Sequence, residues 1–266
     1  MNRKQLEAVL RCAVGAARAA GRLMRQNLHS AKVVNEASRH DIKLELDVRC
    51  QHLIERHLRK AFPAFSVLGE EGCSGPAGAP ARWVVDPIDG TVNFAHSVPH
   101  ACVCVALQTR DPKHETRNTA FGTVVGVVYD PFCDELWTAI RGQPARMNGH
   151  VIHVRRRAKL AEAMVCVGLS KSQQTLKKTL PYFGWVARRT RKIRLMGAAG
   201  LGLSYVACGR FDAYVERRVS LWDIAAGGLI VECAGGKFWS EQAQGYEKYR
   251  LVASNGRLHG QLPVLR

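Results

Sequence analysis

The chain has no long hydrophobic run. None of its 266 residues lies in an apolar stretch approaching the roughly 20 residues that a membrane-spanning helix requires. The first residues do not resemble a secretory signal, because arginines interrupt their apolar positions. The nine cysteines form no C-x-x-C pair, and their number is odd. These absences exclude membrane-spanning, secreted and disulfide-framed proteins and favour reduced thiols in a cytoplasmic protein. The basic, amphipathic start also leaves an organelle transit peptide as an alternative.

Acidic residues are scarce relative to basic ones. Lys and Arg total 39 against 22 Asp and Glu, which gives a formal charge of +17 and a pI near 9.9. Segment 155–194 holds twelve Lys or Arg and a single acid, Glu162, so it supplies +11 of that charge. Such an excess favours anionic partners, such as phosphorylated metabolites, nucleic acid or acidic proteins. The 47% hydrophobic content is enough for a core in one large domain or two small ones.

Hydrophobic periodicity predicts layered helices and sheets, with no internal repeat. We expect a helical and strand-rich half over 1–150 and a more regular α/β half over 151–266, joined in one continuous catalytic unit. Gly, Pro and Asn positions and a polar stretch place the connections between them. The predicted helices cover 3–27, 47–60, 198–208 and 224–234; the predicted strands cover 65–68, 83–85, 101–107, 121–129 and 211–216; loops or turns are predicted at 72–80, 110–119 and 148–149.

Residues 83–94, WVVDPIDGTVNF, carry the clearest chemical signal. An apolar strand delivers Asp86 and Asp89, and Pro87 between them restricts the backbone, which predicts a stiff turn that aims both carboxylates at one point. Carboxylates together with a backbone carbonyl are the oxygen ligands that Mg²⁺ prefers, and it often takes substrate phosphate oxygens as well. Gly90 permits close backbone approach, and N–H groups from there onward are suited to phosphate. On residue types alone, a capped turn with two solvated aspartates remains an alternative.

Two further acidic features accompany this motif. Glu70 and Glu71 directly follow the predicted strand 65–68, and Asp223 precedes the predicted helix 224–234. Taken singly, the glutamates are typical of a solvated strand end and the aspartate of a helix N-cap.

Together these features resemble the inositol monophosphatase family. That family carries G-E-E, then D-P-[IL]-D-G-T-x-N-F, then W-D-x-A-A-G before an E-x-G-G-like stretch, and the order and spacing agree over nearly the whole chain. The resemblance implies an α+β fold in α/β/α/β/α layers. It also implies a Mg²⁺-dependent, Li⁺-sensitive phosphomonoesterase that acts on inositol monophosphate or a similar small metabolite, and a homodimer. The motifs as they stand here are Gly69-Glu70-Glu71, the run from Asp86 to Phe94, Trp222-Asp223-Ile224-Ala225-Ala226-Gly227, and Glu232-Cys233-Ala234-Gly235-Gly236.

The resemblance also implies roles for individual residues, with two or three Mg²⁺ ions per site. Thr91, backed by Asp47, would orient the attacking water, and Glu70 would assist as a third catalytic residue. The N–H groups of Gly90 and Thr91 would bind phosphate. One metal would be held by Glu70, Asp86 and the Ile88 carbonyl, a second by Asp86, Asp89 and Asp223, and the substrate by Asp89, Ser170, Ala199 and Glu216.

The chain departs from the family pattern in three places. Lys43-Leu44 replaces the usual Val-Thr before Asp47, and Ala198 replaces a hydroxyl residue after Gly197. Arg217 and Arg218 follow Glu216, where they would favour a more anionic substrate or else be exposed surface charges.

Alternative functions stay open on the sequence alone. The metal motif is shared by phosphatases of histidinol phosphate, fructose 1,6-bisphosphate and nucleoside 3′,5′-bisphosphates. Some bacterial relatives also bind RNA or transcription machinery, for which the basic segment 155–194 is a candidate surface. Its alternative interpretation is a solvated face with an aromatic helix packed on the core.

Overall fold

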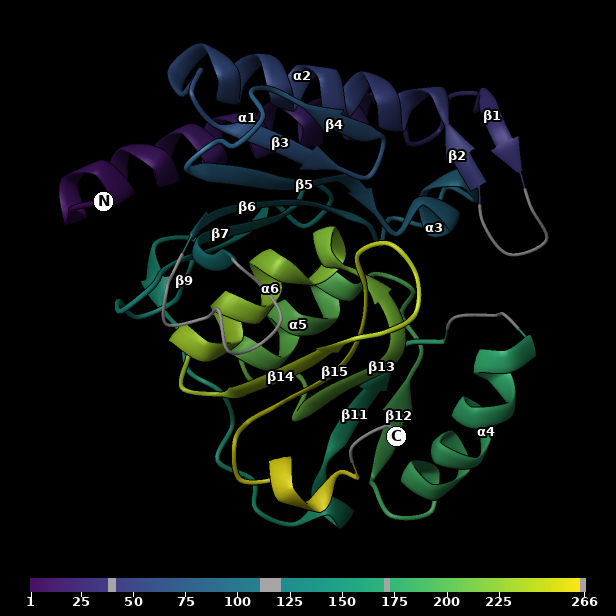
Figure 1. Ribbon diagram of the computed structural model, residues 1–266. Helices are drawn as coiled ribbons and strands as arrows, with labels where there is room; N and C mark the ends of the chain where they lie inside the picture. Colours follow the sequence, from purple (N-terminus) through teal and green to yellow (C-terminus); the bar gives the residue numbers. More distant parts are fainter. Residues whose placement is uncertain (38–41, 111–120, 170–172, 264–266) are drawn as a thin grey trace.

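The computed structural model describes residues 1–37, 42–110, 121–169 and 173–263. Ser170 and most of the predicted connection 110–119 lie outside this part of the chain. Helices and sheets alternate in five layers (Figure 1), which confirms the expected α+β layered fold. The described helices are α1 (Arg3–Asn27), α2 (Glu45–Ala61), α3 (Thr91–Ala95), α4 (Gln173–Ala187), α5 (Ala199–Ala207) and α6 (Leu221–Cys233), with short 3-10 helices at Leu160–Glu162 and His259–Gln261.

Two large sheets form the second and fourth layers, and a hairpin of β1 (Val34–Ala37) and β2 (Ile42–Leu44) lies beside them. The larger sheet is mostly antiparallel, with β3 parallel to β5. In spatial order it contains β10 (His150–Val151), β9 (Arg146–Met147), β8 (Glu135–Ile140), β7 (Phe121–Asp130), β6 (Cys102–Arg110), β5 (Ala81–Asp89), β3 (Ser66–Gly69) and β4 (Gly72–Ser74). The second sheet contains β12 (Lys192–Arg194), β11 (Met164–Val167), β13 (Ala213–Ser220), β15 (Lys248–Ser254) and β14 (Lys237–Gln242).

The side chains of strand β6 show that the larger sheet is covered on both faces. Successive side chains of a strand point to opposite faces. Val103 and Val105 pack in the cluster that α1 and α2 form against the sheet, whereas Cys102 and Cys104 pack in the cluster that contains α5 and α6. All four side chains are fully buried, so the predicted alternation of a buried strand is confirmed.

The helices bury the faces that their sequences make apolar. Helix α1 has the predicted bounds, and its residues Val9, Ala13 and Met24 lie buried against the larger sheet. Helix α6 is apolar on all sides because it lies between the two sheets (Figure 1), where a helix has no solvated face. Helix α4 covers the outer face of the second sheet, and Tyr182 and Val186 enter that smaller core.

Several element predictions were wrong in detail. The predicted strand 83–85 is the nine-residue β5, which continues through Pro87, where we expected a turn. The predicted loop 72–80 begins with the short strand β4. The predicted helix 224–234 begins earlier, at Leu221. The turn at Asn148–Gly149 is confirmed, since both residues have positive φ and join β9 to β10.

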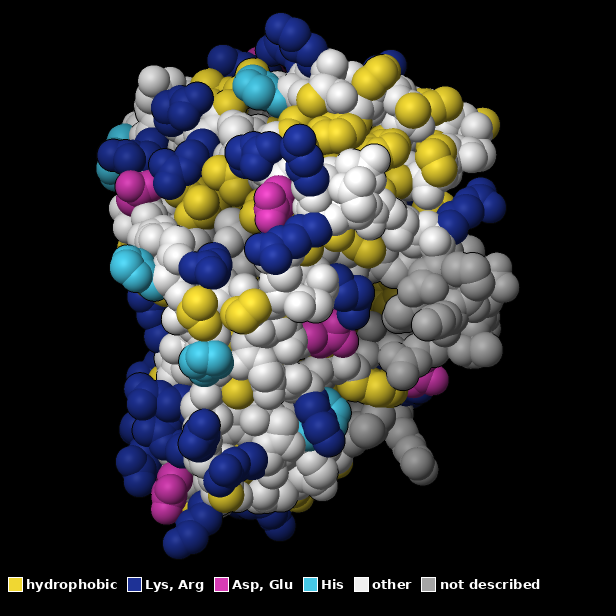
Figure 2. All heavy atoms as spheres, turned by 90° about the vertical axis from the view of Figure 1, so that its left-hand side faces the viewer, with side chains coloured by type: hydrophobic (Ala, Val, Ile, Leu, Met, Phe, Trp, Pro, Cys, Tyr) yellow, Lys and Arg dark blue, Asp and Glu magenta, His cyan; other side chains and the backbone are white. Residues whose placement is uncertain are grey.

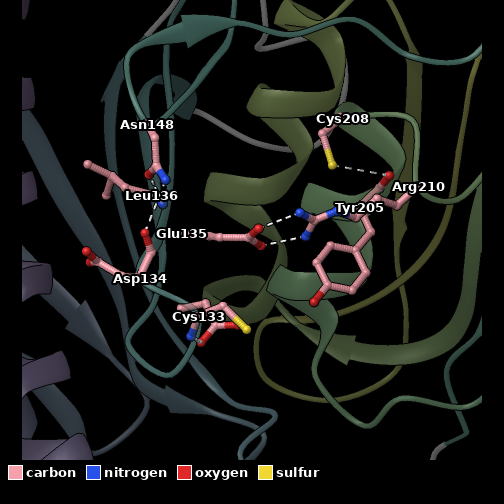
Figure 3. A network of polar contacts seen from close by, with 9 residues as sticks. Cys133, Asp134, Glu135, Leu136, Asn148, Tyr205, Cys208 and Arg210 are labelled. Atoms are coloured by element: carbon pink, nitrogen blue, oxygen red, sulfur yellow. Dashed lines mark hydrogen bonds and ion pairs between the residues drawn. The ribbon is translucent and has the colours of Figure 1, made fainter.

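An ion pair joins β8 to the connection between α5 and β13. Glu135 and Arg210 face each other and form a two-pronged pair (Figure 3). The Arg210 guanidinium also lies 4.9 Å from the ring centre of Tyr205 and 5.9 Å from that of Trp137. The pair therefore ties the larger sheet to the chain that leads into the second sheet.

The basic excess is visible on the surface. Figure 2 shows one face on which Lys and Arg side chains are spread widely and acidic side chains are few. Within segment 155–194, Arg157 is committed to the buried Asp212 at 2.9 Å, whereas Arg188, Arg189 and Arg191 are exposed. None of the described helices combines the length and apolar character needed to cross a bilayer. All nine cysteines belong to the described residues, and each is free.

Candidate active site

A bulge in β5 brings Asp86 and Asp89 to the same side of the sheet. Residues three apart in a regular strand point to opposite faces. Asp86 pairs with Cys104 and Asp89 with Cys102, so β5 has one extra residue between these two pairs. Proline, which has no N–H for the ladder, is tolerated at such a bulge. The bulge that contains Pro87 therefore aligns the two carboxylates, and the predicted turn is wrong.

Backbone N–H groups hold both carboxylates in place. The Ile88 N–H donates to Asp86 Oδ1 at 3.0 Å. Asp89 caps helix α5, because its Oδ1 accepts the Ala199 N–H at 3.1 Å and its Oδ2 accepts the Gly200 N–H at 2.6 Å. Both aspartates are buried, with exposed fractions of 1% and 7%.

The residues after Asp89 turn the chain sharply into α3. Gly90 has φ +95°, a conformation that favours glycine, and it is the N-cap residue of this helix. The Thr91 hydroxyl donates to the Ile88 carbonyl at 2.8 Å. Thr91 and the carbonyl between the two aspartates are thus in direct contact.

The third carboxylate comes from the second half of the chain. Ser220 and Asp223 form a capping box at the start of α6, in which the Ser220 N–H donates to Asp223 Oδ2 at 2.9 Å. One carboxylate oxygen from each of Asp86, Asp89 and Asp223 lies within 4.8 Å of the others. Strand β5 and helix α6, distant in sequence, therefore meet at one acidic cluster.

The carboxylates in this cluster repel one another. Burial and the nearby Glu70, Asp223 and Asp89 raise the pKa of Asp86 well above its ordinary value. Burial and Asp223 raise the pKa of Asp89 to about 7, and burial also raises the pKa of Asp223. Divalent cations relieve such repulsion and keep the acids ionised. An oxygen-only donor set with this electrostatic stress fits a hard divalent cation.

The cluster lines a cavity of about 290 Å³ between the two halves of the chain. Asp47 is not part of the lining; it is buried at the start of α2, where it accepts the Leu44 N–H at 2.7 Å. Ser170 lies outside the described residues. The predicted site residues that line the cavity are Glu70, Asp86, Ile88, Asp89, Gly90, Thr91, Ala199, Glu216 and Asp223.

Glu216 lies on the wall that β13 contributes. The Tyr214 hydroxyl donates to Glu216 Oε2, and burial raises the pKa of Glu216 to about 8. Tyr214, Ser220 and Lys248 also line the cavity, and sequence analysis did not single them out. Ser220 had a readable signal, the S-x-x-D spacing of a capping box. Lys248 had none, because it comes from a strand that follows Asp223 by 25 positions.

A larger groove of about 900 Å³ runs along α2 and holds no comparable acidic cluster. Glu55 is the acid among the residues that line it, and the others are basic or apolar. Solvated side chains of one helix face account for this groove, so we place the candidate site at the smaller cavity.

Comparisons with known proteins cover nearly the whole chain. The family model described as "Inositol monophosphatase family" matches residues 5–264. Inositol monophosphatase 2 of Solanum lycopersicum is 35% identical over 263 residues, covering 95% of this chain and 96% of that protein. Nus factor SuhB of Pseudomonas aeruginosa is 36% identical over 260 residues, covering 94% of this chain and 92% of that protein.

A solved structure also matches this chain over nearly its whole length. The crystal structure of extragenic suppressor protein suhB from Bartonella henselae has a TM-score of 0.87 to this chain and 31% identity, with 96% of each chain covered. Sequence and fold agree over almost the full length. The chain therefore belongs to the inositol monophosphatase family of phosphoric monoester hydrolases.

Proposed function

We propose that the protein is a Mg²⁺-dependent phosphomonoesterase that hydrolyses inositol monophosphate or a similar small phosphate ester. The observation that carries this proposal is the convergence of Asp86, Asp89 and Asp223 within 4.8 Å in a cavity that Thr91 also lines. One cation would be held by Glu70, Asp86 and the Ile88 carbonyl, and a second by Asp86, Asp89 and Asp223. Glu70 would also contact a third, weaker cation site through water.

The residues of the site have complementary roles in this reaction. The cations would lower the pKa of water and offset the charge of the phosphoryl group. The Thr91 hydroxyl gives its hydrogen to the Ile88 carbonyl, so its oxygen is left to accept a hydrogen bond from the attacking water and orient it. The N–H groups of Gly90 and Thr91 would hold phosphate oxygens. No covalent phosphoenzyme is required.

The alcohol part of the ester would lie against Asp89, Ala199 and Glu216. A carboxyl with a pKa of about 8 is mostly protonated at neutral pH, and either form can hydrogen-bond a substrate hydroxyl. The cavity of about 290 Å³ is near the lower end of the roughly 300–1,000 Å³ common for ligand sites, which favours a small metabolite. Histidinol phosphate, fructose 1,6-bisphosphate and adenosine 3′,5′-bisphosphate remain alternative substrates.

The decisive experiment measures phosphate release from inositol 1-phosphate and from these three alternative esters. Each is measured with and without Mg²⁺, and then with added Li⁺. Asp86→Asn is the matched variant, because the amide oxygen can still accept the Ile88 N–H while one charge is lost. We expect Mg²⁺-dependent release from at least one ester and a loss of about 10²-fold or more in kcat for the variant. Circular dichroism checks that the variant is folded.

Three results would contradict the proposal. One is no release from any ester by folded protein with Mg²⁺ present. A second is near-normal activity of Asp86→Asn. The third is release that does not depend on a divalent cation, which would exclude the assigned role of the acidic cluster.

A second function, contact with RNA or transcription machinery, has two observations in its favour. A relative at 36% identity carries the name Nus factor SuhB, and this chain exposes Arg188, Arg189 and Arg191 in its basic segment. Replacing all three by Ala should weaken RNA binding steeply at low salt and leave ester hydrolysis intact. Absence of RNA binding by the unmodified protein at low salt would exclude this role for RNA.

A further inference from the structure

Strand β13 turns one of two adjacent arginines into the candidate cavity. Between β13 and β15, Glu216 pairs with Leu251 and Val219 pairs with Tyr249, so β13 has one extra residue in this stretch. Arg218 lines the cavity, whereas Arg217 lies near Tyr182 of α4 and does not line it. Successive side chains of a strand point to opposite faces, so the two arginines, which are alike in the sequence, have different surroundings.

The guanidinium of Arg218 is held in place by a neutral group. Its Nη1 donates to the Gln244 carbonyl at 2.8 Å, in the turn between β14 and β15. Among the described residues, no carboxylate forms an ion pair with it. The side chain is thus positioned, and its positive charge is not cancelled by a direct partner.

Lys248 adds a second cation to the same wall. Its Nζ donates to the Ser220 hydroxyl at 2.7 Å, again a neutral partner. Its positive charge partly offsets the rise in pKa that burial causes at Glu216 and Asp223. Arg218 and Lys248 are both partly exposed and line the cavity beside Glu216, the residue placed against the alcohol part of the ester.

Arg218 and Lys248 therefore place two positive charges on one wall of a cavity whose other charged residues are acidic. The acidic cluster would bind the cations and, through them, the reacting phosphate. The alcohol part of the ester would then lie near Arg218, and an uncharged polyol offers no negative charge to pair with this arginine. A carboxylate or phosphate does, and a guanidinium binds either one through two parallel hydrogen bonds. We propose that the preferred substrates are phosphate esters whose alcohol part carries a second anionic group, bound by Arg218 with the help of Lys248. This inference rests on the proposed phosphomonoesterase function.

The test compares pairs of esters that differ in the second anionic group. Fructose 1-phosphate is paired with fructose 1,6-bisphosphate, and glycerol 3-phosphate with 3-phosphoglycerate. For each pair, kcat/KM is measured with the full chain and Mg²⁺. One charge-assisted contact predicts a ratio of about tenfold or more in favour of the anionic member of at least one pair. Because Arg218 is partly exposed, this ratio should shrink as the salt concentration rises.

Substitutions of Arg218 test whether this residue causes the preference for the ester with a second anionic group. Arg218→Ala should bring the ratio close to one, chiefly through KM of the anionic ester, and Arg218→Lys should retain part of it. Arg257→Ala is the control: it removes the same charge from an exposed position outside the cavity, and the ratio should stay as in the unmodified protein. Circular dichroism confirms that each variant is folded.

The outcomes separate the inference from the function on which it rests. A preference in the fructose pair alone identifies the second group as phosphate, and one in the glycerol pair alone identifies it as carboxylate. A ratio near one in both pairs, or a ratio that Arg218→Ala leaves unchanged, overturns the inference while the phosphatase stands. No hydrolysis of any ester overturns both.

Discussion

At the scale of single residues, the site depends on a position where no side chain fits. A Cβ at Gly200 would lie 2.4 Å from Cys104 Sγ and 3.0 Å from Asp89 Oδ2, and both of these residues are buried. Gly200→Ala should therefore cost roughly 1–3 kcal/mol of stability and displace the Asp89 carboxylate. A thermal melt and a Mg²⁺ titration monitored by the melting temperature measure the two effects.

Two further variants serve as controls for Gly200→Ala. Adding Cys104→Ala removes the closest clash and should recover part of the stability. Gly15→Ala introduces the same methyl group in α1, where nothing lies within 4 Å, and should be neutral or stabilising. Equal effects of Gly15→Ala and Gly200→Ala would contradict the steric argument.

Thr91 offers a second prediction at this scale. Thr91→Val keeps the shape of the side chain and removes the hydroxyl that contacts the Ile88 carbonyl. If this oxygen orients the attacking water, kcat should fall by about 10²-fold or more, with a much smaller change in KM. Thr91→Ser should restore most of kcat. Steady-state kinetics on the preferred ester measure both, and an unchanged kcat in Thr91→Val would exclude the role.

At the scale of elements, we expect the Glu135–Arg210 ion pair to stabilise the connection between the two sheets (Figure 3). Arg210→Ala should lower the free energy of unfolding by about 1–2 kcal/mol, because the pair is two-pronged but the arginine is partly exposed. Glu135→Gln should have a smaller effect. Denaturant unfolding of the single and double variants yields the coupling energy, and a value near zero would mean that the pair is a surface contact without consequence.

Periodicity predicted the elements that bury a continuous apolar face. Helix α1 was predicted to its exact bounds, and β6 and β7 nearly so, since their apolar residues recur at regular spacing. Strand β14, with sequence KFWSEQ, lies at a sheet edge and exposes most of its residues, so its pattern carried no strand signal. The extension of β5 through Pro87 was not predicted, because a proline inside a strand argues against it unless a bulge is present.

The candidate site was predictable in membership but not in geometry. The resemblance assigned Asp86, Asp89 and Asp223, and the structure brings them together. Their convergence depends on a bulge in β5 and on the packing of α6 between two sheets, which are properties of the folded chain. Lys248 was missed for the same reason, since only the pairing of β13 with β15 places it opposite Ser220 in the lining of the cavity.

At the scale of the whole molecule, the acidic cluster should set the pH dependence of stability. Asp89 and Glu216 have pKa values of about 7 and 8, above their ordinary values of 3.8 and 4.5. The folded state therefore keeps protons that the unfolded state has released, and the metal-free protein should lose stability as pH rises from about 4 to about 8. Mg²⁺ should counter this loss, with a stabilising effect that grows with pH. Thermal melts with EDTA or with Mg²⁺ measure both trends.

Asp86→Asn is the control for this pH dependence. The variant has one fewer carboxylate in the cluster, so its metal-free form should be more stable than the unmodified protein near pH 8 and its stability should vary less with pH. The partly buried His100, whose pKa burial lowers, is unchanged in the variant and its contribution cancels in the comparison. Parallel pH curves for the two proteins would show that the cluster does not control stability.

The bonds from Asp89 to the first N–H groups of α5 have a consequence for the dynamics of the folded chain. The same carboxylate that faces the proposed cations also caps this helix. Its negative charge favours the helix start, and protonation weakens that attraction. Bound cations would keep Asp89 ionised, and the first turn of α5 should then fray less. The amide hydrogens of Ala199 and Gly200 should therefore exchange with solvent more slowly when cations occupy the cavity.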